Sequence, residues 1–131
     1  MSNVVKVAAA IIRQDDKVLI AKRPKDKHKG GYWEFPGGKI ESNETATQAL
    51  QREILEELAI TIELPVAFHK LEFSYPEKTV ELDFYLVESF SGEPQGLEGQ
   101  EICWANIDSL SQFKFPEANV PVVDKLLSST V

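Results

Sequence analysis

The sequence predicts an α+β fold in which a mixed β-sheet is flanked by helices. Strand-like and helix-like segments are interspersed along the chain, without the regular alternation that builds a doubly wound parallel sheet. Two apolar runs, 66–73 and 79–90, flank a polar turn, as expected for strands that follow one another in a sheet. One amphipathic segment follows a pair of glycines and indicates a helix. Because no repeat or linker is recognisable, we expect a single domain over residues 1–131.

Turn residues divide the chain into its other elements. Residues 4–13 and 18–22 are rich in β-branched and small apolar side chains, and they are predicted to form a hairpin across a polar turn. A polar loop at 23–31 leads to a short strand, which the sequence Pro36-Gly37-Gly38 ends. The expected elements, in order, are strands at 4–13, 18–22 and 32–35, a helix from about Glu44 to Leu58, strands at 66–73, 79–90 and 101–105, a short helix near Asp108, and a helix at 119–128.

The helix predicted at 44–58 has an ordinary core-facing side. Its start is indicated by Ser42-Asn43-Glu44, which offers a capping side chain and an acid near the positive end of the helix dipole. At about 100° per residue, its larger apolar side chains fall on one arc. The members of this arc are Leu50, Ile54, Leu55 and Leu58. We expect that arc to pack against the sheet.

A second arc of the same helix collects three acids, Glu53, Glu56 and Glu57, at the spacings i, i+3 and i+4. Like charges at these spacings destabilise a helix by roughly 0.2–0.5 kcal/mol per pair, and the last two also lie near the negative end of the dipole. Residues that destabilise the local structure tend to occur together at functional sites. A divalent cation would relieve the repulsion, because carboxylate oxygens suit Mg²⁺ or Mn²⁺. The alternative is a solvated acidic face.

The glycine pair before the helix favours the metal-site interpretation. Gly37 and Gly38 let the backbone approach a ligand closely and leave a carbonyl oxygen available to a metal. Taken alone, two glycines indicate only a tight turn. Glycines and acids in this order are more specific than either feature by itself.

Composition limits the possible partners. Fourteen Lys and Arg residues against 21 Asp and Glu residues give a net charge of −7, which disfavours duplex nucleic acid. A small anionic substrate can still bind where metal ions bridge the two negative partners. The single cysteine, Cys103, suits a reducing compartment, and the apolar run at 7–12 is too short to span a membrane. We therefore expect a cytoplasmic monomer that binds neither duplex nucleic acid nor membranes.

The stretch from Gly38 to Ile60 resembles the signature of the Nudix hydrolases. That signature is Gly, five residues, Glu, seven residues, Arg-Glu, an aliphatic residue, any residue, Glu-Glu, any residue, Gly and an aliphatic residue. The matching positions here are Gly38, Glu44, Arg52, Glu53, Ile54, Glu56, Glu57 and Ile60. The resemblance implies a Nudix-like α/β/α sandwich with a catalytic loop–helix–loop, in which Gly38, Glu44 and Arg52 have structural roles.

Ala59 departs from the signature, which has glycine at that position. The family glycine ends the helix with a positive φ, a conformation that costs alanine about 1–2 kcal/mol. We therefore expect a slightly different turn at Ala59. The metal chemistry is expected to survive, because this residue supplies no ligand.

The resemblance also implies a metal site and a catalytic base. Its ligands would be the Gly37 carbonyl and four glutamates, with Mg²⁺ as the expected cofactor and Mn²⁺ as a possible substitute. These glutamates are Glu53, Glu56, Glu57 and, from a later loop, Glu98. Either Glu53 or Glu98 is the general base, and the sequence leaves that choice open. Without the resemblance, Glu98 would be an ordinary exposed loop acid.

A further resemblance, to the MutT-type Nudix enzymes, spans nearly the whole chain. It rests on residues 34–41, 97–100 and 115–122, and it implies hydrolysis of 8-oxo-dGTP to 8-oxo-dGMP and pyrophosphate. Asn119 is the residue expected to select the base. Oxidised guanine carries a hydrogen-bond donor at N7 beside the O6 acceptor, and an Asn amide offers the complementary pair. An isolated Asn at this position would otherwise be interpreted as a helix cap.

The other substrate-binding candidates are less specific. Arg23 suits oxyanions, although most loop arginines are simply solvated. Glu34 and Phe35 follow from the MutT resemblance, with core packing as the alternative for Phe35, and Lys78 lies in the turn expected near the base. Two rival functions remain: a Nudix pyrophosphatase for another nucleotide, such as a pyrimidine triphosphate, and a non-catalytic Nudix-like binding module. Intact acids in the helix disfavour the second rival.

Overall fold

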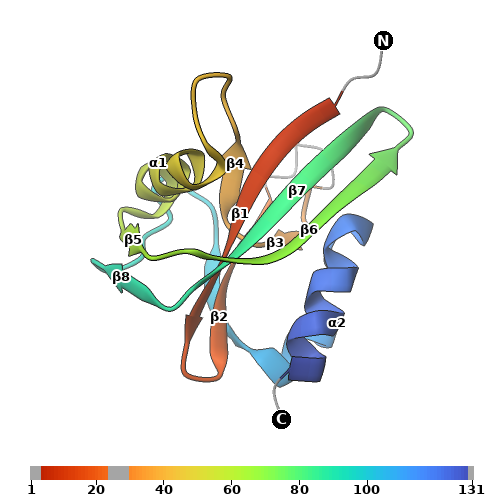
Figure 1. The fold of residues 1–131 in the computed structure, drawn as a ribbon. Helices are drawn as coiled ribbons and strands as arrows, with labels where there is room; N and C mark the ends of the chain where they lie inside the picture. Colours follow the sequence, from red (N-terminus) through yellow and green to blue (C-terminus); the bar gives the residue numbers. More distant parts are fainter. Residues whose placement is uncertain (1–3, 24–29, 130–131) are drawn as a thin grey trace.

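A mixed sheet built around one long strand forms the middle of the molecule (Figure 1). The computed structural model describes residues 4–23 and 30–129. β1 (Val4–Gln14) forms a tight antiparallel hairpin with β2 (Lys17–Lys22) and runs parallel to β7 (Lys78–Val87). Antiparallel and parallel pairings therefore meet on the same strand. Five successive residues of β1, 8–12, are buried, as expected for a strand that is covered on both faces.

Shorter elements complete the framework. The other strands are β3 (Trp33–Glu34) and β9 (Ile102–Asn106) beside β2, β4 (Gly37–Lys39) beside β1, β6 (Val66–Tyr75) beside β7, and a separate pair of β5 (Thr61–Glu63) with β8 (Ser89–Ser91). The helices are α1 (Ala46–Leu58) and α2 (Val120–Ser129), preceded in the case of α2 by the 3₁₀ turns η1 (Ile107–Gln112) and η2 (Glu117–Asn119).

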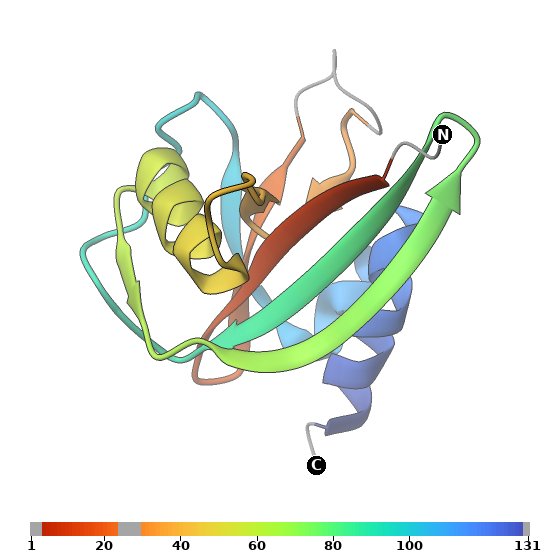
Figure 2. The same ribbon diagram turned by 45° about the horizontal axis from the view of Figure 1, so that its top comes forward.

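The two α-helices lie on opposite faces of the sheet (Figures 1 and 2). Alternate residues of β1 point to each side, so the strand contributes to two apolar clusters. The cluster on the α1 side includes Ala8, Ala10, Ile12, Leu19, Leu50, Ile54 and Leu58. The cluster on the α2 side includes Ala9, Ile11, Ile20, Phe35, Leu82, Phe84, Val122 and Leu126. The predicted α+β fold, a mixed sheet between helices in an α/β/α sandwich, is confirmed.

The start of α1 differs from the prediction. The cap is Thr45 rather than Ser42 or Asn43, and the helix begins at Ala46. The Thr45 hydroxyl accepts from the Gln48 backbone N–H at 3.2 Å, while the Gln48 side chain accepts from the Thr45 N–H at 2.9 Å. This reciprocal capping box satisfies two N–H groups that the first turn leaves without partners. It also leaves Glu44 just outside the helix, free to bind elsewhere.

The predicted apolar arc of α1 needs one correction. Leu50, Ile54 and Leu58 are buried, but Leu55 is 51% exposed. The spacing i, i+4, i+8 of the three buried leucine and isoleucine side chains gives a narrower stripe than the predicted arc. Leu55 lies on the solvent side of that stripe.

The turn after α1 also differs from our expectation. Ala59 adopts the left-handed conformation, with φ 62° and ψ 26°, so the turn keeps the geometry of a glycine C-cap. Its N–H donates to the Leu55 carbonyl at 3.1 Å, which satisfies one carbonyl of the last turn. The predicted change of turn geometry is wrong; the chain instead bears the backbone strain of an alanine in this region.

Three smaller predictions need comment. The Pro36-Gly37-Gly38 turn is in fact the entry to strand β4, whose residues pair with Val7 to Ala9 of β1. The strand predicted at 79–90 is interrupted at Glu88 and forms β7 and β8, which belong to different sheets. The loop predicted at 23–31 lies partly outside the described residues.

Candidate active site

Strand β4 and helix α1 bring the glycine pair against the first acid of the helix. A Cβ atom built on Gly38 would lie 2.3 Å from the Glu53 carboxyl carbon, so only glycine leaves room for this carboxylate. A Cβ atom on Gly37 would lie 2.1 Å from the Ala8 carbonyl oxygen of the neighbouring strand. The two glycines therefore serve different needs: Gly37 allows the strands to approach, and Gly38 makes space for Glu53.

Arg52 links the loop before α1 to the acids on the helix. Its Nε and Nη2 donate to the two carboxylate oxygens of Glu44 at 2.7 and 2.9 Å, a paired geometry that guanidinium groups favour. Its Nη1 donates to Glu53 at 2.9 Å and to Glu56 at 3.2 Å. The hydrogen bonds from Arg52 lower the pKa of Glu44 to about 2. Arg52 thus offsets part of the repulsion that the sequence predicts for the helix.

The Glu57 carboxylate is still repelled by the neighbouring acids, because the hydrogen bonds of Arg52 go to Glu44, Glu53 and Glu56. Its pKa is raised first by burial, then by a hydrogen bond with the Glu53 carboxyl, and then by the negative charges of Glu53, Glu98 and Glu34. Carboxyl groups from the helix, the later loop and strand β3 therefore act on one another here. Among the described residues, no cation lowers the pKa of Glu57, and clustered carboxylate oxygens of this kind fit a hard divalent ion.

The predicted metal ligands share one region, but their side chains are not gathered around a single point. Within residues 4–23 and 30–129, no group of three or more His, Cys, Asp or Glu side chains has the arrangement of a closed metal site. Glu56 is half-exposed and turned to Arg52, while Glu98 lies on an exposed loop. The loop is nevertheless docked on the helix, because the Leu97 N–H donates to the Glu57 carbonyl at 3.0 Å.

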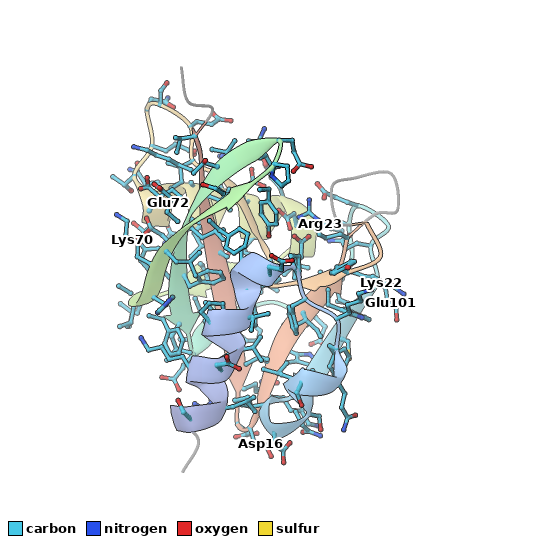
Figure 3. All side chains as sticks on the ribbon, turned by 90° about the vertical axis from the view of Figure 1, so that its right-hand side faces the viewer. Asp16, Lys22, Arg23, Lys70, Glu72 and Glu101 are labelled. Atoms are coloured by element: carbon cyan, nitrogen blue, oxygen red, sulfur yellow. The ribbon has the colours of Figure 1, made fainter. Side chains whose placement is uncertain are left out.

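A pocket of about 220 Å³ lies next to the glycine pair. All five side chains predicted to bind substrate line it, although they come from four separate parts of the chain. These are Arg23, Glu34, Phe35, Lys78 and Asn119. Gly37 and Gly38 belong to the same lining, so the pocket and the Glu53 carboxylate meet at strand β4. Figure 3 shows Arg23 near the end of α2 at which the helix begins.

An ion pair lies in the pocket wall. The Arg23 guanidinium donates to the Glu34 carboxylate at 2.6 Å. Burial nevertheless raises the pKa of Glu34, against the lowering effect of Arg23 and with a small further rise from the charge of Glu98. Glu34 therefore faces both the pocket and the acids beside α1.

Aromatic packing and one hydrogen bond support the rest of the pocket. Phe35 stacks on Phe115 with ring centres 5.3 Å apart and meets Phe84 edge-on at 6.1 Å, so it belongs to the core as well as to the lining. The Ala118 N–H donates to the Tyr75 hydroxyl at 3.3 Å, which ties the turn before α2 to strand β6. Asn119 is the last residue of the 3₁₀ turn η2, directly before α2, and it borders the pocket.

Sequence reasoning missed the apolar part of the lining. Val5 and Val7 of β1 and Val80 and Leu82 of β7 form this side of the pocket. Their alternate spacing along each strand was a readable sign that they share one face. Nothing local, however, indicates that this part of the face borders a pocket rather than a helix.

The sheet-and-helix sandwich sets the carboxylates of α1 beside a small polar and aromatic pocket, and this arrangement suits a small anionic substrate that is bridged to the acids by metal ions. The NUDIX domain family model matches residues 7–125. The chain therefore belongs to the NUDIX domain family, and it is a Nudix hydrolase.

Individual relatives agree with this assignment. The chain is 43% identical over 122 residues to the 8-oxo-dGTP diphosphatase of Escherichia coli strain K12, covering 92% of this chain and 95% of that protein. It is 36% identical to the CTP pyrophosphohydrolase of the same organism, covering 95% and 92%. A solved structure from a study of MutT from Aliivibrio salmonicida and Vibrio cholerae superposes with a TM-score of 0.84 at 41% identity, covering 96% and 98%. Among the residues that the structure describes, no helix combines the length and the apolar character that a membrane span requires.

Proposed function

We propose that this protein hydrolyses 8-oxo-dGTP to 8-oxo-dGMP and pyrophosphate, with Mg²⁺ as its cofactor and Mn²⁺ as a working substitute. The main observation behind this proposal is that strand β4 borders both the pocket and the acids of α1. Gly37 and Gly38 line the pocket, and the Glu53 carboxylate packs directly on Gly38. A nucleoside bound in the pocket can therefore extend its phosphates toward the helix acids. The name of the relative at 43% identity supports the choice of nucleotide.

The metal ligands we propose are the Gly37 carbonyl and the carboxylates of Glu53, Glu56, Glu57 and Glu98. A divalent ion held by such groups would neutralise the triphosphate and lower the pKa of a bound water. The protein's own contribution is to hold those oxygens ready. Arg52 orients Glu53 and Glu56 through its hydrogen bonds, and Gly38 leaves the space that Glu53 needs.

The general base in this proposal is Glu53 or Glu98. Either carboxylate would take the proton of the water that attacks the β-phosphorus, which separates the monophosphate from pyrophosphate. Glu53 is held by Arg52 at 2.9 Å, whereas the Glu98 carboxylate belongs to an exposed loop. A base must reach the water that it deprotonates, so the position of bound substrate decides between them.

Asn119 is the residue we propose to read the oxidised base. Its amide lies at the pocket wall and can donate to O6 and accept from the N7–H of 8-oxoguanine. Ordinary guanine has an acceptor at N7, which would face the amide oxygen. A mismatch of this kind in a buried site can give discrimination of about 10⁴–10⁵-fold.

A turnover screen tests this proposal. The protein would be supplied with Mg²⁺ and, separately, 8-oxo-dGTP, dGTP, CTP and dCTP, and pyrophosphate release would be measured. We expect kcat/KM to be highest for 8-oxo-dGTP. Equal turnover of 8-oxo-dGTP and dGTP would refute the base preference, and absence of pyrophosphate with every nucleotide would refute the hydrolase activity proposed here.

CTP hydrolysis is the second candidate, because the chain is 36% identical to a protein named CTP pyrophosphohydrolase. The same screen distinguishes the two, since a pyrimidine enzyme would prefer CTP or dCTP to both purine nucleotides.

We further propose that the protein acts as a monomer and that its substrate is a free nucleotide. The net charge of −7 disfavours a duplex, whose binding needs many cationic contacts.

A further inference from the structure

The side chain of Gln100 joins the loop that carries Glu98 to the end of helix α1. Its amide nitrogen donates to the Glu57 carbonyl oxygen at 3.2 Å, across a sequence separation of 43 residues. Its amide oxygen accepts from the Glu98 backbone N–H at 2.9 Å. One planar group thus bonds the backbone of two residues whose carboxylates belong to the same acidic region.

Main-chain hydrogen bonds hold the same loop against the helix. The Leu97 N–H donates to the Glu57 carbonyl at 3.0 Å, and the Gln95 N–H donates to the Leu58 carbonyl at 2.9 Å. The last carbonyl groups of an α-helix have no partner within the helix. Here a distant loop supplies their donors, so the loop is fixed to the helix end by its backbone as well as by Gln100.

The turn between these contacts directs Gln100 back toward the helix. The Gly99 N–H donates to the Gly96 carbonyl at 3.0 Å, and Gly99 adopts a φ of +77° that favours glycine. A Cβ atom on Gly96 would lie 2.2 Å from the Gln100 carbonyl oxygen. Glycine at 96 therefore permits the close approach that places the Gln100 amide between Glu98 and Glu57.

We propose that Gln100 is a positioning residue that fixes the Glu98 backbone beside Glu57, so that both carboxylates can serve one divalent cation. The proposal rests on the metal-dependent function proposed above. Groups that orient metal ligands, without binding the metal themselves, typically change metal affinity or activity by about 10–100-fold when they are replaced. Without the Gln100 amide, Leu97 and Gln95 would still hold the loop, but the Glu98 backbone would lose its link to the helix end. The Glu98 carboxylate would then have to be ordered at each binding event, which costs conformational entropy.

The test compares Gln100→Ala and Gln100→Met with Gln95→Ala. Gln95 lies on the same loop but holds the helix through its backbone N–H, so its side-chain replacement is a matched control. Methionine keeps the length of glutamine without its donor or acceptor, which provides a folded variant if alanine disturbs the loop. Mn²⁺ affinity would be measured by titration calorimetry on the free protein, and kcat, KM and the Mg²⁺ concentration for half-maximal rate would be measured with 8-oxo-dGTP.

We expect both Gln100 variants to bind Mn²⁺ about tenfold more weakly and to lose about 10–100-fold in kcat, with KM for the nucleotide changed by less than about threefold. Gln95→Ala should match the wild type. If Gln100 acts through Glu98, the double variant Glu98→Gln/Gln100→Ala should be no worse than Glu98→Gln alone. Unchanged Mn²⁺ affinity in both Gln100 variants, or additive losses in the double variant, would overturn the proposal.

Activity and positioning can fail separately. A wild type that releases no pyrophosphate from any nucleotide, but whose Mn²⁺ affinity falls only in the Gln100 variants, would refute the proposed function and support the role of Gln100. An active wild type with fully active Gln100 variants would support the function and refute that role.

Discussion

Arg52 binds both carboxylate oxygens of Glu44 through hydrogen bonds of 2.7 and 2.9 Å, and it reaches Glu53 with its remaining terminal nitrogen at 2.9 Å. Arg52 thereby links Glu44, in the loop before α1, to Glu53, a helix residue of the proposed metal site. The contact explains why a loop acid and a helix arginine belong to one sequence signature. It also gives the loop–helix junction a measurable pH dependence.

Because of this ion pair, we expect the free energy of unfolding of the wild type to fall in acid relative to that of Glu44→Gln. The pKa of Glu44 is lowered from 4.5 to about 2, so its folded-state carboxylate binds protons less readily than the unfolded one. Its contribution is therefore complete above the unfolded pKa and is lost as pH falls through the folded pKa. Wild type should be the more stable protein near neutral pH, and the difference should shrink from about pH 4.5 down to about pH 2.

Urea unfolding at several pH values measures this difference. Glu41→Gln is the control, because Glu41 is 64% exposed and 3.8 Å from Arg52. We expect that control to follow the wild type. A difference between wild type and Glu44→Gln that stays constant down to the lower pKa would contradict the assignment.

The glycine pair should separate activity from stability. Gly38→Ala places a Cβ atom 2.3 Å from the end of the flexible Glu53 side chain, so the carboxylate must move while the backbone can stay. A displacement of about 1 Å at a reacting group can cost about 10²-fold in rate, and we expect a fall of that size in kcat. Gly37→Ala instead meets the Ala8 carbonyl at 2.1 Å and should destabilise the fold by about 1–3 kcal/mol.

Steady-state kinetics and urea unfolding of both variants provide the comparison. The expected pattern is a stable, poorly active Gly38→Ala protein and an unstable Gly37→Ala protein. The reverse pattern, with full activity in Gly38→Ala, would show that the Glu53 position beside this glycine does not matter to the reaction.

Ala59→Gly should stabilise the protein. Alanine pays about 1–2 kcal/mol for the left-handed conformation, whereas glycine costs about 0.4–1 kcal/mol through the entropy of the unfolded chain. With φ at 62°, the net gain should be about 0.5–1 kcal/mol in the free energy of unfolding. The same substitution at Ala49, in the right-handed interior of α1, should lose about 1 kcal/mol or more. An Ala59→Gly protein no more stable than the wild type would argue that the turn relaxes in solution.

The sequence predicts those secondary-structure elements that depend on neighbouring residues in the chain. The hairpin of β1 and β2 and the course of α1 follow from apolar periodicity over consecutive residues. The exact helix start did not follow, because Ser42, Asn43 and Thr45 are all competent caps and only the partner at Gln48 selects Thr45. The turn at Ala59 could not be predicted from local propensity. Propensity gives the energetic cost of the left-handed conformation for alanine, but the packing of the whole fold determines whether the chain adopts it.

Long-range arrangements were accessible only through family resemblance. Arg23, Lys78 and Asn119 line one pocket, yet nothing in the intervening sequence states that their segments meet. The role proposed for Gln100 was not predictable for the same reason, since its hydrogen bond to the Glu57 carbonyl depends on the docking of a loop 43 residues further along the chain. The acids on α1 were recognisable because a helix places them by spacing alone.

Replacement of the helix acid nearest the glycine pair should remove activity. Glu53→Gln keeps the size of the side chain but removes its charge, so the proposed metal site loses a charged ligand. The substitution also alters the hydrogen bonds of this side chain with Arg52 and Glu57. We expect Mg²⁺-dependent pyrophosphate release to fall by about 10²–10⁴-fold, with the circular dichroism spectrum unchanged. Undiminished turnover in this variant would remove Glu53 from the proposed machinery.

The preference for an oxidised base should depend on Asn119. This residue borders the pocket beside Ala118, whose N–H is anchored to the Tyr75 hydroxyl, so its backbone position should survive replacement of the side chain. Asn119→Ala removes both the donor and the acceptor that we propose to distinguish 8-oxo-dGTP from dGTP. We expect the ratio of kcat/KM values for the two nucleotides to fall at least about tenfold, mainly through loss with 8-oxo-dGTP. A ratio that is unchanged in Asn119→Ala would assign base selection to another side chain of the pocket, and Lys78→Ala would then be the variant to compare.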